Sequence, residues 1–256
     1  MSSIERPASA ATAKTRRPPK AWKFWGTLLW GLVIFVAMFL GQAVVVGVLL
    51  WRRGSFDMAT LNELLAGGLT LSLSVVAGLP AVVGAIWLAT RAARMDFADY
   101  VALRRPSWKL LLIGVVALAA LVQAWDFVAT ATGRDVAPGF MGEVLKSARA
   151  DNTLWLLVVA FCVAAPLTEE LFVRGFLYRG WSESFLRIAG AIILSSLVWT
   201  VMHLQYNWFF LAQVFSIGLL LGYLRYVSDS IWVPIVLHGL NNLAATIQTM
   251  WLTGSS

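Results

Sequence analysis

The sequence is dominated by long apolar runs that short charged loops separate. An α-helix rises about 1.5 Å per residue, so about 20 apolar residues cross the roughly 30 Å hydrocarbon layer of a membrane. Backbone groups in lipid need internal hydrogen bonds, and the runs lack the alternation of a transmembrane barrel, so each run predicts a spanning helix. We expect an all-α transmembrane bundle of seven spans, or eight if the first run is a re-entrant pair, at residues 26–51, 64–90, 110–132, 153–178, 188–206, 208–226 and 231–252.

The composition agrees with a membrane protein and excludes other classes. Hydrophobic residues make up 59% of the chain and charged residues 13%, which is too little polar surface to coat a soluble protein. The single cysteine, Cys162, allows no internal disulfide and no cysteine-based metal cluster. The net charge of +7 is spread over the loops, which favours topology signals over a nucleic-acid-binding surface.

The positions of Lys and Arg predict how the chain is oriented. Residues 1–24 are basic and contain no apolar run, so we expect a disordered cytoplasmic tail, followed by N-terminal transmembrane helices in residues 25–150. With the N-terminus inside, fifteen Lys and Arg residues, Arg174 among them, fall on the cytoplasmic side and five on the other. Positive residues mark cytoplasmic loops, so we expect a multi-pass protein of the cell membrane with its N-terminus in the cytoplasm.

Three charged residues follow directly on the fourth apolar run. An ionised group at the centre of a spanning helix costs about 2.5–3.5 kcal/mol on the insertion scale, so Glu169, Glu170 and Arg174 require compensation. Glu170 and Arg174 are four residues apart and can pair on one helix face. Glu169 points about 100° away from that face and is left without this partner. This makes Glu169 the candidate proton acceptor.

The two histidines of the chain also lie in apolar runs, each with a neighbour at helical spacing. Trp199 precedes His203 by four residues, and Asn242 follows His238 by four. His238 and Asn242 therefore share a helix face and offer hydrogen-bond donors side by side. Asn241 points about 100° away from that face. Either histidine alone could simply hydrogen-bond a neighbouring helix, so the inference depends on the four residues meeting.

Other positions carry weaker expectations. Pro166 lacks a backbone donor and can kink the fourth helix near the acid pair, which opens room for water. Asp126, near the outer end of the third span, is expected to cap the helix or to reach the interface. Residues 139–151 suggest a short amphipathic surface helix, with Phe140, Val144, Leu145 and Ala148 on its apolar face.

A glutamate, two histidines and an asparagine between helices suit the hydrolysis of an amide bond. Glu169, helped by His203, could activate a water molecule as a general base, and His238 and Asn242 could donate to the oxyanion. The same residues could instead hold zinc, because Glu169, His203 and His238 form a two-histidine, one-acid ligand set. No H-E-x-x-H helix is present, so we prefer water activation that needs no cofactor, with zinc as the alternative.

Three motifs resemble those of a known family. The string APLTEELFVRGFLYRG, with Glu169, Glu170 and Arg174, resembles the E-E-x-x-x-R signature of the CPBP intramembrane proteases, which include the CAAX prenyl endopeptidases and abortive-infection-type proteins. The second motif, F-x-x-x-H, is matched by residues 199–203 with tryptophan in place of phenylalanine, and the third, H-x-x-x-N, by residues 238–242. The resemblance covers about residues 150–250, so residues 151–256 are expected to form the protease core.

The resemblance implies an assignment of roles. Glu169 and His203 would activate the attacking water, while His238 and Asn242 would form the oxyanion hole. Arg174 would steady the acid pair with Glu170. The family is commonly labelled metalloprotease, but its better-understood members resemble glutamate-dependent enzymes. The substituted Trp199 is expected to alter substrate fit more than catalysis.

Two other functions remain open at this level. The chain could be a non-catalytic membrane immunity or scaffolding protein of the same fold, because the family includes members tied to bacteriocin self-protection. It could also be a proton-coupled transporter that uses Glu169 and Glu170 as a relay, although no inverted repeat is visible. For the protease, the expected partners are the lipid bilayer and a peptide or protein substrate cut near the cytoplasmic side, with a lipidated peptide as one possibility.

Depth in the membrane sets a condition on the shared site. Counting about 1.5 Å per residue from the cytoplasmic face places Glu169 and His238 about 12 Å deep and His203 about 22 Å deep. A common site therefore requires a tilted fifth helix or a cavity that descends from the cytoplasm.

Overall fold

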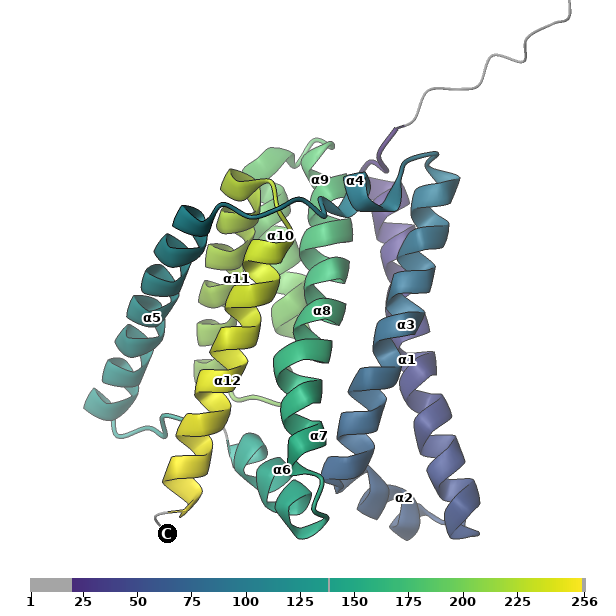
Figure 1. Cartoon of the computed structure of the whole chain (residues 1–256), viewed down its shortest axis with the longest axis vertical. Coiled ribbons are helices and arrows are strands. Elements are labelled where there is room, and N and C mark those ends of the chain that lie inside the picture. The colour runs from purple at the N-terminus through teal and green to yellow at the C-terminus, as the bar shows by residue number, and fades with distance from the viewer. Residues whose placement is uncertain (1–19, 138, 255–256) are drawn as a thin grey trace, which may run out of the picture.

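The computed structural model describes residues 20–137 and 139–254, and every regular element in these ranges is a helix. The helices pack as a bundle whose long members run roughly parallel to one axis (Figure 1). The prediction of an all-α architecture is confirmed. The long helices are α1 (Phe24–Arg53), α3 (Gly68–Ala92), α5 (Trp108–Ala131), a composite helix from Leu154 to Ser182, α10 (Arg187–Val201), α11 (Trp208–Ser228) and α12 (Trp232–Gly254).

The number of membrane-spanning helices differs from the number of apolar runs in the sequence. Five helices of the described chain are long and apolar enough to cross a membrane, namely α1, α3, α5, the 154–182 helix and α11. The helix α10 is apolar but has only 15 residues. The helix α12 is long enough but contains polar residues such as Asn241 and Gln248, which lower its mean hydropathy. The count of seven is therefore not confirmed. The first run forms one uninterrupted helix of 30 residues, which excludes a re-entrant pair there.

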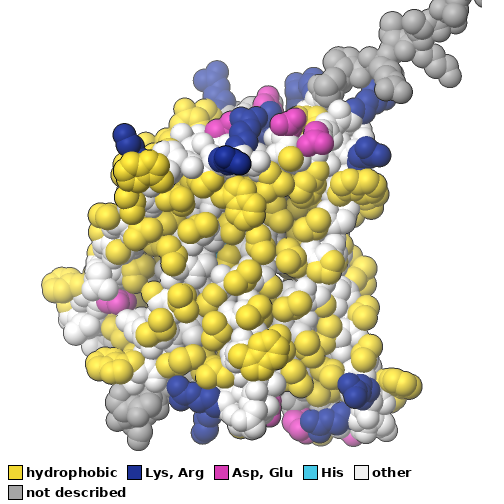
Figure 2. All heavy atoms as spheres, viewed as in Figure 1, with side chains coloured by type: hydrophobic (Ala, Val, Ile, Leu, Met, Phe, Trp, Pro, Cys, Tyr) yellow, Lys and Arg dark blue, Asp and Glu magenta, His cyan; other side chains and the backbone are white. Residues whose placement is uncertain are grey.

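The surface divides into bands as expected for a protein in a bilayer. Hydrophobic side chains form a broad belt around the middle of the visible face, and charged side chains gather at its two ends (Figure 2). The first described residues lie at one end of the bundle and the C-terminal end of α12 at the other (Figure 1). The chain is a multi-pass membrane protein. Which end faces the cytoplasm stays a prediction. Arg174 is fully buried, so it does not count among the loop Lys and Arg residues on which the orientation prediction is based.

The start of the described chain is packed rather than free. The indole Nε1 of Trp22 donates to the carbonyl of Ala89 at 3.0 Å, and Thr27 donates to the carbonyl of Trp22. The expected tail is therefore too long by at least residues 20–23, which lie against α3 and the start of α1. Its remaining part, residues 1–19, lies outside the described residues.

Short helices close the two ends of the bundle. The helices α2 (Met58–Ala66) and α6 (Gly139–Ala150) lie at one end, and α4 (Phe97–Val101) lies at the other (Figure 1). The predicted helix at 139–151 is confirmed, but its buried face holds Met141 with Val144, Leu145 and Ala148, whereas Phe140 is 37% exposed. The helix packs on the ends of α3 and α12, so it covers protein rather than lying free on the surface.

The composite helix 154–182 is the central element. It runs as α7 (Leu154–Val159), a π-helical segment η1 (Ala160–Ala164), α8 (Ala165–Glu170), a second π-helical segment η2 (Leu171–Leu177) and α9 (Tyr178–Ser182). All residues of η2 are buried against neighbouring helices. The π segments flank the acid pair, and such segments often occur at functional sites because they redirect side chains and free carbonyls.

Candidate active site

A buried ionic cluster joins the central helix to α12. One guanidinium nitrogen of Arg174 donates to Glu170 Oε1 at 2.9 Å, and His238 Nδ1 lies 2.9 Å from the same oxygen. Arg174 also donates to the carbonyl of Gly218 in α11 at 3.2 Å. Glu170 and Arg174 are fully buried. The predicted pair at four-residue spacing is confirmed, and the additional contacts tie it to two more helices.

Glu169 lies beside this cluster and has a partner that the sequence pattern missed. The indole Nε1 of Trp199 donates to Glu169 Oε2 at 2.6 Å. Spacing along the central helix could not predict this partner, because Trp199 lies on a different helix. The Arg174 guanidinium lies over the Trp199 ring, 4.5 Å from its centroid, so the same indole contacts both the arginine and the acid.

Trp199 brings the two histidines to the same place. Its ring meets His203 and His238 edge to face, with centroids 5.1 Å away in both cases. His203 Nδ1 also lies 2.9 Å from the carbonyl of Trp199. Glu169, His203 and His238 therefore all contact one side chain, that of Trp199.

Glu169 and Trp199 lie at similar depths because two helix ends differ from the prediction. The central helix continues to Ser182, which places Glu169 about 20 Å from that end at 1.5 Å per residue. Trp199 lies about 18 Å along α10 from Arg187 by the same count. The helix α10 ends at Val201, so His203 follows it in a turn and folds back toward Trp199.

Asn242 has a structural partner that Pro166 explains. In η1 the backbone bonds run five residues back, as from the N–H of Ala165 to the carbonyl of Ala160. The next such bond would join residue 166 to Phe161, but proline has no N–H. Asn242 Nδ2 donates to this free carbonyl at 2.8 Å. The proline thus widens the helix locally, and α12 supplies the missing donor.

Close helix packing at this point requires glycine. A Cβ atom on Gly239 would lie 2.7 Å from the carbonyl oxygen of Cys162, so α12 can approach η1 only because residue 239 has no side chain.

An amide nitrogen carries two hydrogens, so Asn242 keeps one donor after its bond to Phe161. His238 keeps its Nε2, which has no hydrogen-bond partner within the described part of the chain.

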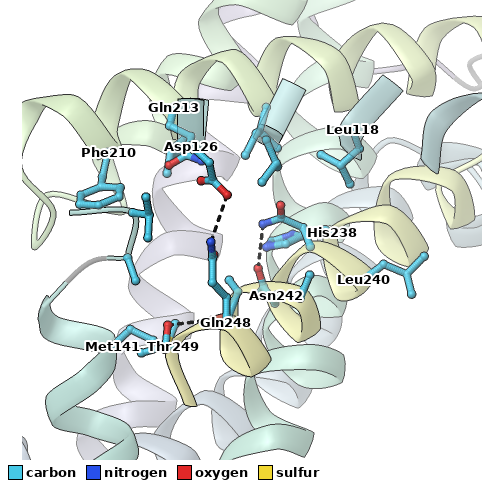
Figure 3. Close-up of a pocket in the computed structure, with 18 of the residues that line it drawn as sticks. Leu118, Asp126, Met141, Phe210, Gln213, His238, Leu240, Asn242, Gln248 and Thr249 are labelled. Atoms are coloured by element: carbon cyan, nitrogen blue, oxygen red, sulfur yellow. Dashed lines mark hydrogen bonds between the residues drawn. The ribbon is translucent and has the colours of Figure 1, made fainter. Parts of the chain in front are cut away.

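A cavity of about 770 Å³ lies next to these groups. Helices α5, α11 and α12 and the turn after α10 contribute to its walls, and His203 is among the residues that line it. His238 and Asn242 line it as well (Figure 3). The cavity extends from His238 along α12 toward the end of the bundle that carries α6. The start of α1 lies at the opposite end of the bundle (Figure 1). The cavity can therefore open toward the cytoplasm only if the N-terminus is outside, so the two expectations exclude each other.

Other cavity residues were missed or misread in the sequence. Asp126 of α5 accepts a hydrogen bond from Gln248 of α12 at 3.0 Å, and Gln213 of α11 points into the same space (Figure 3). The expectation that Asp126 caps its helix or reaches the interface is wrong, because α5 continues to Ala131 and Asp126 lines the cavity. The only sequence signal for this group is that polar residues are kept inside apolar runs.

The residues do not form a metal centre in this arrangement. No group of three His, Cys, Asp or Glu side chains suited to a metal occurs in the part of the chain that the structure describes. The three residues considered as zinc ligands face different partners: Glu169 the Trp199 indole, His203 the Trp199 carbonyl and His238 the Glu170 carboxylate.

The fold and site define a polytopic helical membrane protein with a buried polar cluster beside an intramembrane cavity. Residues 151–244 match the model of a family described as type II CAAX prenyl endopeptidase Rce1-like. The UPF0177 protein YbdI of Lactococcus lactis subsp. lactis is 35% identical over 96 residues, which cover 36% of this chain and 49% of that relative. The match thus spans about half the length of the curated relative, and no solved structure matches.

Residues 151–244 are thus similar to the CAAX prenyl endopeptidases of the CPBP intramembrane proteases. The resemblance drawn from the three motifs is confirmed. All three motifs lie within the matched residues, and so do the buried ionic cluster and Trp199.

Proposed function

We propose that the protein is an intramembrane endopeptidase that hydrolyses a peptide bond with a water molecule activated by Glu169. The observation that carries the proposal is the contact of Glu169, His203 and His238 with one side chain, Trp199, at the edge of a cavity. Glu169 takes the proton of the water as general base, and His203 assists in orienting the water.

The oxyanion donors come from α12. His238 Nε2 and the second amide hydrogen of Asn242 are the groups left for a ligand once the internal bonds are made. Donors held in place before the reaction stabilise the charge that develops on the scissile carbonyl. Glu170 and Arg174 are positioning residues in this scheme, because Glu170 holds the ring of His238 through its Nδ1 and Arg174 holds Glu170.

The proposed substrate is a peptide or protein segment at the membrane, with a lipidated peptide as one candidate. An apolar cavity of this size suits a segment that comes from the bilayer. If the N-terminus is cytoplasmic, the cavity approaches the opposite side, and the cut then falls in the outer half of the membrane rather than near the cytoplasm.

Comparison of membrane fractions from cells with the wild-type protein and with Glu169→Gln tests the proposal. New peptide N-termini are expected only with the wild type, and their sequences identify the substrate. The matched control is Glu183→Gln, which removes an exposed carboxylate at the end of the same helix. A Glu169→Gln strain with the same set of N-termini and the same phenotype as wild type would instead favour the non-catalytic immunity or scaffolding function.

A further inference from the structure

A second polar group lines the cavity, in addition to His203, His238 and Asn242. Asp126, Gln213 and Gln248 come from three different helices, α5, α11 and α12, and face the same space (Figure 3). Asp126 Oδ2 accepts from Gln248 Nε2 at 3.0 Å. None of these residues belongs to the three family motifs.

The carboxylate of Asp126 has no cationic partner among the described residues. Residues 20–137 and 139–254 contain no Lys, Arg or His that forms an ion pair with it. An acid in a spanning helix is costly and usually faces a functional cavity with a partner of opposite charge. A neutral amide would hold α5 to Gln248 equally well, so the hydrogen bond alone does not account for a charge at this position.

The spacing along α12 relates this group to the proposed reaction centre. Gln248 follows His238 by ten residues, which corresponds to about 15 Å along a helix. An extended peptide advances about 3.3 Å per residue, so this length equals four to five residues of substrate. Both ends of the interval line one cavity, so a single peptide can reach both.

We propose that Asp126, with Gln213 and Gln248, binds a lysine or arginine side chain of the substrate peptide, four to five residues from the cleaved bond. The inference rests on the proposed function and adds a specificity for substrate charge. Asp126 supplies the counter-charge, and the two glutamine side chains supply amide oxygens for the remaining N–H donors of the cation.

The test uses a series of apolar peptides in detergent solution. Each peptide carries one lysine at a different position, and a peptide with glutamine at the same position serves as its reference. Binding to the full-length Glu169→Gln protein is measured by fluorescence anisotropy, and cleavage by wild type is measured in parallel. We expect lysine at four to five residues from the bond to bind about tenfold tighter than glutamine, as one charge-assisted hydrogen bond provides. Adding Asp126→Asn is expected to remove this preference while it keeps the hydrogen bond to Gln248.

Two further variants separate charge recognition from helix packing. Gln248→Ala breaks the bond between α5 and α12 but keeps the charge, so lysine is still expected to be preferred. Glu143→Gln removes an exposed charge on α6 at the same end of the bundle and is expected to leave the preference unchanged. Equal binding of the lysine and glutamine peptides at every position, or a preference that survives Asp126→Asn, would overturn the inference. Absence of cleavage with an intact lysine preference in binding would contradict the proposed function alone.

Discussion

The indole Nε1 of Trp199 donates a hydrogen bond of 2.6 Å to Oε2 of Glu169, across the interface between α10 and the central helix. The family motif has phenylalanine at this position, and a phenylalanine ring has no donor. The substitution therefore changes the surroundings of the proposed base, so we expect it to affect catalysis as well as substrate fit. The same indole contacts both histidines, so it sets the geometry of the whole cluster.

We predict that Trp199→Phe keeps the fold and lowers kcat for peptide cleavage about tenfold, with a smaller change in KM. The ring still packs between the histidines, but Glu169 loses a hydrogen bond to a charged group, which is typically worth about 1.5–3 kcal/mol. Steady-state kinetics of the purified protein measure the change. Trp208→Phe is the control, because Trp208 is 85% exposed. An unchanged kcat would show that the hydrogen bond does not position Glu169.

The buried cluster predicts a large difference between two neighbouring glutamates. Glu170→Gln leaves the fully buried Arg174 without its counter-charge, and breaking such a pair costs about 3–5 kcal/mol. Glu183→Gln removes the exposed pair with Arg179 and is expected to cost about 0–1 kcal/mol. Thermal unfolding of both variants in the same detergent measures the difference. Equal melting temperatures would contradict the burial of the Glu170–Arg174 pair.

The link between Pro166 and Asn242 can be tested with a double-mutant cycle. Asn242→Leu is expected to destabilise the protein by about 1–3 kcal/mol because the carbonyl of Phe161 loses its donor. Pro166→Ala supplies a backbone N–H, so the same substitution should cost less in that background. Cleavage should stay impaired in the double variant, since the oxyanion donor is still missing. Strict additivity of the two stability changes would refute the link.

The orientation prediction has a direct labelling test. In a Cys162→Ser background, Arg52→Cys and Arg105→Cys place one thiol at each end of the bundle, at exposed positions. With the N-terminus in the cytoplasm, a membrane-impermeant maleimide should label residue 52 in intact cells and residue 105 only after lysis. The reverse pattern would place the cavity on the cytoplasmic side and the N-terminus outside.

The sequence predicts contacts within one helix better than contacts between helices. The pair Glu170 and Arg174 follows from helical periodicity, which fixes the direction of side chains four residues apart. The bonds from Trp199 to Glu169 and from His238 to Glu170 depend on how separate helices are placed, and no spacing along the chain encodes that. The motifs of a known family compensated for this, because they name residues that meet in space.

Local backbone changes were also beyond sequence reasoning. Pro166 predicted a disturbance in the fourth helix, but not that the disturbance takes the form of a π segment whose free carbonyl is bonded by Asn242. The end of α10 at Val201 was missed because the apolar pattern continues past it. Asp126 was misassigned since its partner, Gln248, is far away in sequence.

Cleavage of a membrane-derived peptide by purified Glu169→Gln protein tests the central claim most directly, with Glu183→Gln and wild type assayed beside it. Glu169→Gln should fold with a melting temperature near that of wild type and yield no product, while Glu183→Gln should cleave at the wild-type rate. Product formation by folded Glu169→Gln at a rate comparable to wild type would show that this carboxylate does not activate the water.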